Sequence, residues 1–562
     1  MRFCIGLVFV LNIMLSSASA QTYPKGYFRY PLDIPPKLNA NFGEMRPNHF
    51  HMGLDLFTNK RENLPVYAAA DGYVSKVKIE PGGFGHALYI THPNGFTTLY
   101  AHMNAFLPEV EAWIKGEQYR RESWSVEMDA PPGKFPVKKG QVVGKSGNTG
   151  ASQGPHVHFE VRDSRSGKCL NPLLFGFPIP DDVAPDIGRL AVYDRNKSMY
   201  GQHPRIVPIR KSGSGYSAGL VRVETDKLTL ALQATDHTGK VPNANGIFSV
   251  VAEDNGRPAG GFRLDRIGYE DTRYLNAHID YMHKLGGGGY LQGLFPLPGD
   301  KLDIYDRRAP GYMVLKDTLR HEVRLTVRDA YGNSSVLNFQ VQRIAGPKTN
   351  VPVTGDMMRP GELNVEESDG LQVYIPEGCL YDSVVYIPRS RPEAGPLSFS
   401  PIHSVLSYLI PSHKSFSVRI RPDKPVPVAF KDHMLMRRKG KADDIDVMHA
   451  ALQSGYYAAD FREFGDYQLI ADDKPPVILM GGLHEGANMS RAPKIVVMVM
   501  DDNHAVGNFR AELDGKWLLF ARKSNTFAYD MDEHCPPGHH TLHIRVSDEA
   551  GNLAEKTVNF TR

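Results

Sequence analysis

Cysteine is scarce in this chain, with 4 among 562 residues. Cys4 lies at the extreme N-terminus, and the other three, Cys169, Cys379 and Cys535, are spread over most of the remaining length. An odd number at such spacing is not a disulfide framework, so packing must hold the domains together without covalent cross-links. We expect all three to be buried thiols.

An excess of charge of either sign is also missing. The chain has 65 Lys and Arg against 62 Asp and Glu, a net charge of +3. A nucleic-acid-binding protein usually shows a stronger basic bias, so we expect no nucleic-acid partner. After the N-terminus no stretch is long and apolar enough to cross a bilayer, so no membrane span is expected.

The N-terminus has the pattern of a secretory signal peptide. Met1-Arg2 is positively charged, Phe3 to Leu15 is nearly all apolar, and Ala18-Ser19-Ala20 is a small-residue cleavage site. The apolar stretch is shorter than the roughly 20 residues of a transmembrane helix. We expect residues 1–20 to be removed and the protein to be exported to the periplasm or cell envelope, or to the extracellular space.

What the chain has in quantity is turn residues. The 53 glycines and 41 prolines favour many short strands over long helices. The length predicts about three to five domains. The front of the chain, residues 21–180, is predicted to form one β-rich domain with a hairpin turn at Pro93-Asn94-Gly95 and one amphipathic helix over 105–120. Its predicted strands are Val74–Ile79, Ala87–Thr91, Thr97–Tyr100 and Val157–Arg162.

The rear of the chain contains an internal repeat. An alternating strand, an Asp-x-x-Gly-Asn turn and a second strand occur at Asp329–Asn333 and again at Asp548–Asn552. We therefore predict related β-sandwich (Ig-like) domains over 181–345 and 476–562, with a separate β-rich domain over 350–475. The predicted fold class is mainly β.

Histidines in ordered motifs carry the chemistry of the front domain. His51 and Asp55 are four residues apart around Gly53, while His156 and His158 share one face of a strand, since side chains there repeat every two residues. His102 ends another strand. Two histidines and a carboxylate with one coordination position open are the ligands of a catalytic zinc, which activates water, while spare histidines can transfer protons.

These motifs resemble the lysostaphin/LytM-type zinc metallopeptidases, which cut peptide bonds in bacterial cell wall. The matching segments are H-x-x-x-D (His51, Asp55), Y-A-H (Tyr100–His102) and G-N-T-G…G-P-H-x-H-F-E (Gly147–Glu160). The resemblance implies an antiparallel β catalytic domain with a long groove and Zn²⁺ held by His51, Asp55 and His158. It also implies that His102 and His156 are the catalytic pair, which activates water and steadies the oxyanion.

The implied function is a secreted zinc metalloendopeptidase that hydrolyses stem peptides or cross-links of peptidoglycan. The alternative is a catalytically inactive module that binds the wall and activates another hydrolase. His49, two residues before His51, is an alternative ligand, whereas His86 and His92 are expected to pack or hydrogen-bond near the site.

One departure from compact family members lies between His102 and His156, which are separated by 53 residues. This insertion contains the predicted helix, so we expect residues 105–135 to form a rim or lid on the groove. Residues after 181 are expected to be dispensable for bond cleavage and to place the enzyme, through binding to the wall or a cell-envelope partner.

Overall fold

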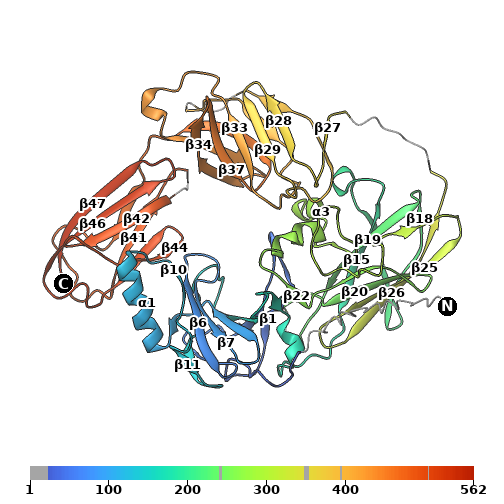
Figure 1. Cartoon of the computed structure of the whole chain (residues 1–562), viewed down its shortest axis with the longest axis horizontal. Helices are drawn as coiled ribbons and strands as arrows, with labels where there is room; N and C mark the ends of the chain where they lie inside the picture. The colour runs from blue at the N-terminus through green and yellow to red at the C-terminus, as the bar shows by residue number, and fades with distance from the viewer. Residues whose placement is uncertain (1–22, 239–242, 347–353, 393–394, 396, 504–505) are drawn as a thin grey trace, which may run out of the picture.

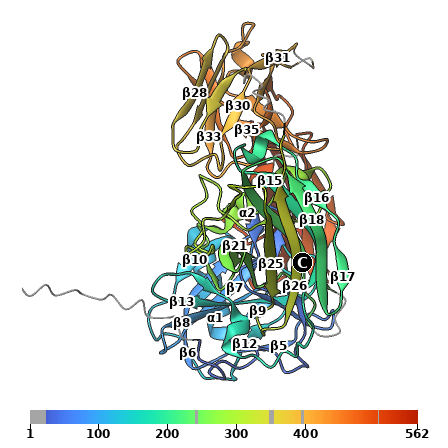
Figure 2. The same cartoon turned by 90° about the vertical axis from the view of Figure 1, so that its right-hand side faces the viewer.

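The computed structural model describes residues 23–238, 243–346, 354–392, 395, 397–503 and 506–562. The predicted signal peptide, residues 1–20, lies outside these. Strands dominate, so the prediction of a mainly β chain is confirmed. Four β-rich units follow one another around a ring (Figure 1), and a view turned by 90° shows the third unit projecting at one end (Figure 2). We call residues 23–180, 181–346, 354–475 and 476–562 the first to fourth units.

The first unit is built on one large antiparallel sheet, which contains all four predicted strands. In spatial order its strands are β1 (Leu38–Ala40), β4 (Leu54–Phe57), β13 (His156–Asp163), β8 (Phe96–Ala101), β7 (His86–Thr91), β6 (Gly72–Ile79) and β10 (Val126–Asp129). The predicted turn joins β7 to β8, and Gly95 there has φ = +83°, which favours glycine. β11 (Pro136–Val137) pairs with β6, and β14 (Cys169–Leu170) pairs with β13.

Two smaller sheets complete this unit. One is the hairpin of β2 (Met45–Arg46) and β3 (His49–Phe50), and the other has the order β5 (Pro65–Tyr67), β12 (Val142–Lys145) and β9 (Ala105–Phe106). One face of the central strands packs on an apolar core in which Phe28 and Tyr30 join Val157 and Phe159. Residues of the opposite face, such as Leu99 and Ala101, are buried as well.

The predicted helix is present as α1 (Pro108–Arg121), three residues later than expected. Ala105-Phe106 instead forms β9, a pairing with β12 that helical periodicity does not reveal. Pro108 then suits the first helical turn, since its missing N–H has no partner there. Val110, Ile114 and Gln118 are buried along one face of α1 and attach it to the first unit.

The second unit contains two sheets and the first copy of the repeat. One sheet has the order β16 (Arg205–Val207), β15 (Asp186–Asp194), β19 (Lys227–Thr235) and β23 (Gln292–Gly293), and β24 (Met313–Val314) also pairs with β19. The other has the order β17 (Arg210–Ser212), β18 (Gly215–Val223), β26 (Ser334–Arg343), β25 (Arg320–Arg328), β20 (Ser249–Asp254) and β21 (Arg257–Arg263). Short helices α2 (Leu275–His278) and α3 (Tyr281–Leu285) lie in one connection. The predicted Asp-x-x-Gly-Asn turn joins β25 to β26.

The first and second units share a sheet and a core. β14 pairs with β22 (Arg266–Ile267), so the front sheet continues into the second unit. Phe42, Phe50 and Met52 pack in the same apolar cluster as residues between 187 and 341. The two units therefore pack as neighbours with a common interior, and a separate Ig-like domain over 181–345 stays a prediction.

The third unit has two five-stranded sheets and a short hairpin. One sheet has the order β28 (Asn364–Ser368), β29 (Leu371–Ile375), β33 (Phe416–Ile420), β37 (Tyr456–Phe461) and β36 (Ala451–Gln453). The other has the order β31 (Arg389–Arg391), β32 (Ile402–Val405), β38 (Gly465–Ala471), β34 (Met434–Lys439) and β35 (Ile445–His449), while β27 (Asp356–Met358) pairs with β30 (Val384–Tyr386). Their buried faces form a core of their own.

The fourth unit contains the second copy of the repeat. Its sheets have the orders β39 (Val477–Gly481), β41 (Lys494–Met500), β45 (Thr526–Asp530), β44 (Ala521–Lys523), and β40 (Ala487–Asn488), β47 (Leu553–Thr561), β46 (His539–Asp548), β42 (Val506–Leu513), β43 (Lys516–Trp517). In β46 buried and more exposed side chains alternate, as expected of a strand with one face on a core. Cys169, Cys379 and Cys535 are buried free thiols, as predicted.

The ring closes where α1 meets the fourth unit, as Figure 1 shows for α1 and β41. Lys115 Nζ lies 2.8 Å from carboxylate oxygens of both Asp532 and Glu533, and Tyr119 stacks on the ring of His534 with centroids 3.8 Å apart. Arg510 pairs with Glu122 at 2.7 Å. Among the described residues, no helix has the length and apolar character needed to cross a membrane.

Candidate metal centre

The pairing of three strands assembles the predicted site. In the register of β4 with β13, Asp55 lies directly opposite His158, and His158 is also opposite Ala101 of β8, one residue before His102. Gly53 allows the close approach of this segment, because a Cβ at that position would lie 2.4 Å from the carbonyl oxygen of Phe159. The glycine inside the H-x-x-x-D motif thus has a packing reason.

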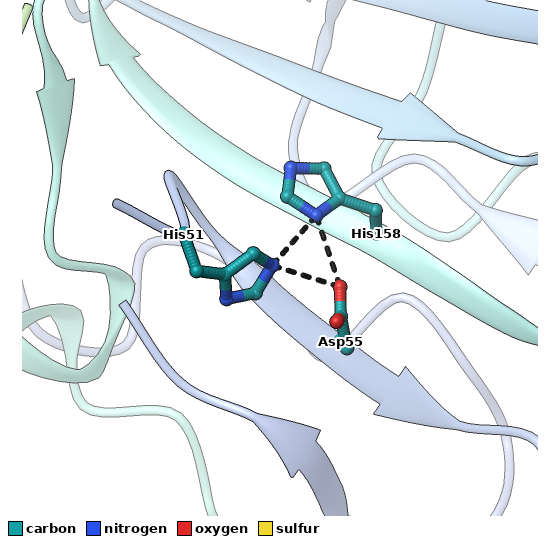
Figure 3. A group of neighbouring side chains, drawn as sticks. All are labelled: His51, Asp55 and His158. Atoms are coloured by element: carbon teal, nitrogen blue, oxygen red, sulfur yellow. Dashed lines mark hydrogen bonds and ion pairs between the residues drawn. The ribbon is translucent and has the colours of Figure 1, made fainter. Parts of the chain in front are cut away.

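His51, Asp55 and His158 present three donor atoms to one point (Figure 3). His51 Nε2 lies 2.9 Å from both Asp55 Oδ1 and His158 Nδ1, and the latter two atoms are 3.0 Å apart. All three side chains are buried, with exposed fractions of 5–6%. Two imidazole nitrogens and one carboxylate oxygen at this spacing can share a single metal ion.

The hydrogen bonds behind the two imidazoles fix which nitrogen is free. His51 Nδ1 lies 2.7 Å from the carbonyl oxygen of Asn41. Because a carbonyl oxygen can only accept a hydrogen bond, Nδ1 must carry the proton. His158 Nε2 in the same way donates to Glu160 Oε1 at 2.9 Å. The lone pairs of His51 Nε2 and His158 Nδ1 therefore face the common point, as the outer partners of a metal site require.

Charges around the site favour a cation there. Burial would raise the pKa of Asp55, but the nearby histidines hold it well below its usual range, so the carboxylate stays ionised. Arg46 Nη2 binds the other oxygen, Asp55 Oδ2, at 2.8 Å and leaves Oδ1 directed at the imidazoles. Burial lowers the pKa of His51, whereas for His158 the carboxylates of Asp55 and Glu160 outweigh burial and raise the pKa to about 9. A metal ion must therefore displace a proton from His158 before Nδ1 can bind it.

His102 and His156 lie beside this cluster without entering it. Their ring centroids are 4.7 Å apart, and His156 Nε2 is 3.4 Å from Asp55 Oδ1. His102 Nδ1 donates to the carbonyl of Thr149 and His156 Nδ1 to that of Gly154, both at 2.8 Å, so each Nε2 is unprotonated in the neutral ring. Burial and the neighbouring histidines lower the pKa of His102 to about 3.

The backbone at His102 is unusual for a non-glycine residue, with φ = +60°. Such a conformation is uncommon and concentrates at functional sites. The carbonyl of Phe84 accepts a hydrogen bond from the His102 N–H at 2.9 Å, which helps to hold it. No pattern in the sequence indicated this conformation.

The other front histidines lie outside the cluster. His49 is exposed, and its Nδ1 donates to the carbonyl of Pro47 rather than facing Asp55. His92 hydrogen-bonds the carbonyl of Asp71 and the hydroxyl of Thr98, as expected of a structural histidine. His86 packs against Phe106 and Trp124, and burial lowers its pKa to about 4.

Comparison with known protein families agrees with this geometry. The model of Peptidase family M23 matches residues 49–119 and 131–172, a range that contains His51, Asp55, His102, His156 and His158. Residues 49–172 form a peptidase family M23 domain. A second model, of the Zu5-like domain, matches residues 355–472 in the third unit.

Curated relatives share the M23 domain. An uncharacterised metalloprotease of Haemophilus influenzae is 32% identical over 167 residues, which are 28% of this chain and 29% of that protein. The DD-carboxypeptidase/endopeptidase Mpg of Neisseria meningitidis serogroup B is 30% identical over 195 residues, 34% of this chain and 39% of that protein. A more distant relative is the murein hydrolase activator NlpD of Salmonella dublin, 27% identical over 28% of this chain and 34% of its own length. The chain thus spans only about a third of these relatives.

Among solved structures, a point mutant of the catalytic domain of the prophage-encoded M23 protein EnpA from Enterococcus faecalis is 26% identical. The similarity covers 26% of this chain and 96% of that domain, with a TM-score of 0.20.

A residue of the second unit completes the surroundings of the M23 site. Tyr269, two residues after β22, donates its hydroxyl to Glu160 Oε1, the same oxygen that accepts from His158. Glu160 is fully buried, and its other oxygen accepts from Arg162 Nε at 2.6 Å. Arg162 also lies over the Tyr269 ring at 4.6 Å. Tyr269 therefore helps to position Glu160 and, through it, His158.

We expect Tyr269→Phe to weaken metal binding about 10-fold, the lower end for outer partners of a metal ligand, because Glu160 keeps its bond from Arg162. Competition with a chromophoric chelator would measure the affinity. Tyr312→Phe, the same change elsewhere in the second unit, is the control. Equal metal affinity in Tyr269→Phe and wild-type protein would contradict a positioning role.

Proposed function

We propose that this protein is an exported zinc metalloendopeptidase that hydrolyses peptide bonds of bacterial peptidoglycan, in stem peptides or cross-links, in the cell envelope. The observation that carries the proposal is the convergence of His51 Nε2, Asp55 Oδ1 and His158 Nδ1 within 3.0 Å of one another in an M23 domain. The relative Mpg, named a DD-carboxypeptidase/endopeptidase, supports peptide hydrolysis, and the relative NlpD, named a murein hydrolase activator, supports the cell wall as the target.

The donor set fits zinc, which binds imidazole nitrogen and carboxylate oxygen and keeps an open position in catalytic sites. When bound, zinc lowers the pKa of water and polarises a carbonyl group. The described residues supply the rest. Asn41 and Glu160 orient the two imidazoles, and Arg46 holds the carboxylate of Asp55.

His102 and His156 are suited to move the protons of peptide hydrolysis. Each ring is anchored through Nδ1–H on a backbone carbonyl, so Nε2 is free to accept a proton from the attacking water. The ring that takes the proton gains an N–H, which can donate to the developing oxyanion or return the proton to the leaving amine. Because the two rings are adjacent, one can accept the proton of the water while the other donates to the oxyanion or the leaving amine.

Digestion of purified peptidoglycan tests the proposal. The zinc-loaded protein should release fragments whose masses correspond to cleaved peptide bonds with intact glycan strands. The second candidate, a wall-binding activator, has the NlpD relative in its favour. It predicts no products from the purified protein alone and faster release by an added wall hydrolase, and that outcome would replace the enzymatic function.

The rear units are in contact with the segments that carry the site. Tyr269 of the second unit bonds Glu160, Glu463 of the third accepts from Asn48 at 3.2 Å, and Lys523 of the fourth donates to the carbonyl of Asn148 at 3.3 Å. Asn148 precedes Thr149, whose carbonyl anchors His102. These contacts do not test the expectation that residues after 181 are dispensable for bond cleavage and place the enzyme. We infer in addition that they hold the site residues in position.

The same contacts bear on the predicted role of residues 105–135 as a rim or lid. Lys115 and Tyr119, one turn apart on α1, and Glu122, just past its end, dock on the fourth unit, while the buried face of α1 attaches to the first. α1 does not stand free at the edge of the first unit. It makes the polar contact with the fourth unit that closes the ring. We infer that opening this contact admits bulky cross-linked wall to the site.

Charge reversal tests this inference. The double variant Lys115→Glu, Arg510→Glu sets carboxylates against Asp532, Glu533 and Glu122, and because single surface ion pairs are worth only about 0–1 kcal/mol, both are changed. We expect a larger maximum dimension in solution scattering, retained zinc and a several-fold rise in cleavage of cross-linked wall relative to soluble peptides. Arg120→Glu, on the same helix but paired with Glu117, is the control. An opened ring with unchanged substrate preference would refute the gating role.

A further inference from the structure

Three aspartates meet where the linker after the M23 domain reaches the second unit. Asp181 lies at the start of the second unit, in the linker that leads from the M23 domain to β15, while Asp236 directly follows β19 and Asp329 directly follows β25. One carboxylate oxygen of each lies within 4.8 Å of the other two. Asp236 and Asp329 are both 3% exposed, so two of the three carboxylates are almost fully removed from water.

Asp329 is held rigidly by the repeat turn. Its Oδ1 accepts the backbone N–H groups of Tyr331, Gly332 and Asn333 at 2.7–2.9 Å. The side-chain amide of Asn333 donates to Asp329 Oδ2 at 2.7 Å and to the backbone carbonyl of Asp181 at 3.4 Å. The turn therefore ties the linker backbone to the segment that carries Asp329.

Asp236 is the member whose surroundings are incomplete. Its Oδ1 is buried and has no hydrogen-bond partner among the described residues. A buried polar atom in that condition loses its bonds to water without compensation. Burial, reinforced by the charges of Asp181 and Asp329, raises the pKa of Asp236 to about 7, so the carboxylate is destabilised where it stands.

We propose that Asp181, Asp236 and Asp329 form a Ca²⁺ site that ties the linker to the second unit. The three donors are hard carboxylate oxygens. Ca²⁺ accepts six to eight such ligands in irregular geometry, whereas Mg²⁺ demands a near-ideal octahedron and zinc prefers nitrogen and sulfur. A bound cation gives the buried carboxylate of Asp236 a partner and relieves the repulsion among the three charges.

The same arrangement recurs in the fourth unit. Asp472, Asp501 and Asp548 form an equivalent group. Asn552 donates to Asp548 Oδ2 at 2.9 Å and to the carbonyl of Asp472 at 3.1 Å, as Asn333 does in the second unit. The recurrence shows that the repeat itself builds the cluster. The proposal rests on the first group alone and does not depend on the hydrolytic function.

Such a site would bear on the M23 domain through the chain. The linker that contains Asp181 begins where the first unit ends, and the unit that it joins supplies Tyr269 to Glu160. A cation between linker and second unit would thus hold Tyr269 in a fixed relation to the metal centre.

Calorimetric titration of the full-length, zinc-loaded protein with CaCl₂ tests the proposal. Asp236→Asn should bind one Ca²⁺ fewer than wild type, and Asp317→Asn, a half-exposed aspartate in the same unit, should bind the wild-type number. We also expect 1 mM CaCl₂ to raise the first unfolding temperature of wild type by about 2–4 °C and that of Asp236→Asn by less. Without Ca²⁺ the Asn variant should be at least as stable as wild type, because it removes a repelling charge.

Three results would overturn the site. These are no Ca²⁺ binding by wild type at millimolar concentration, an unchanged count in Asp236→Asn, or equal loss in Asp317→Asn. If Asp236→Asn does not fold, Asp181→Asn replaces it, since Asp181 lies in the linker and is only partly buried. Asp181→Asn should likewise bind one Ca²⁺ fewer than wild type, and an unchanged number would overturn the site.

Discussion

Asp55→Ala should lose both its metal and its hydrolytic activity. Asp55 Oδ1 is the one charged donor of the cluster and lies within 3.0 Å of both imidazole nitrogens. Its removal leaves the two histidines without a carboxylate between them and deprives Arg46 of its partner, so a positive charge remains where a cation should bind. We expect metal affinity to fall by more than the roughly 10–100-fold typical of outer-partner changes.

Metal analysis of the purified variant measures this effect, together with cleavage of soluble wall peptides. Asp33→Ala is the matched control, because Asp33 is also ion-paired with an arginine, Arg29, but is exposed and outside the site. If Asp55→Ala is poorly folded, Asp55→Asn keeps the side-chain size and removes the charge. Full zinc occupancy in a folded Asp55 variant would show that the metal-ligand assignment is wrong.

The sequence could indicate this cluster because its motifs are short and local. Two-residue periodicity puts His156 and His158 on one face, and His51 and Asp55 are only four residues apart. Strand pairing then joins the two motifs. The mainly β class followed from turn residues and alternation, which are local signals too.

What the sequence could not indicate is contact between distant segments. Tyr269 follows Glu160 by 109 residues, and nothing near either residue indicates that they meet. The helical pattern of α1 was visible, but its partner was not, since Lys115 and Glu533 are 418 residues apart. The start of α1 was misplaced for the same reason, because β9 exists only by pairing with β12. These contacts depend on the ring, a tertiary property.

The cluster of Asp181, Asp236 and Asp329 could be predicted from the sequence only in part. The repeat turn and the alternating strand before it were predicted from the sequence. The structure adds that the turn aspartate, the strand-end aspartate and a linker aspartate converge. Local chemistry specified the turn, and the packing of linker against unit brought the third carboxylate to it.

His102→Ala and His156→Ala should keep the metal and lose hydrolysis. Neither ring lies within the three-atom cluster, and both are anchored on backbone carbonyls by Nδ1. Loss of a positioned proton-transfer group typically lowers the rate by about 10²–10⁴-fold. We expect each variant to fall in that range on soluble wall peptides.

Zinc content and kcat measured on the same preparations separate the roles. His156 Nε2 lies 3.4 Å from Asp55 Oδ1, so a small decrease in affinity is expected for His156→Ala and none for His102→Ala. His49→Ala is the control, since His49 is exposed and should affect neither quantity. Metal loss in His102→Ala comparable to that of Asp55→Ala would make His102 a ligand and overturn the division between binding and catalysis. Metal loss in His49→Ala would instead indicate that His49, the alternative considered from the sequence, is a ligand in place of His51.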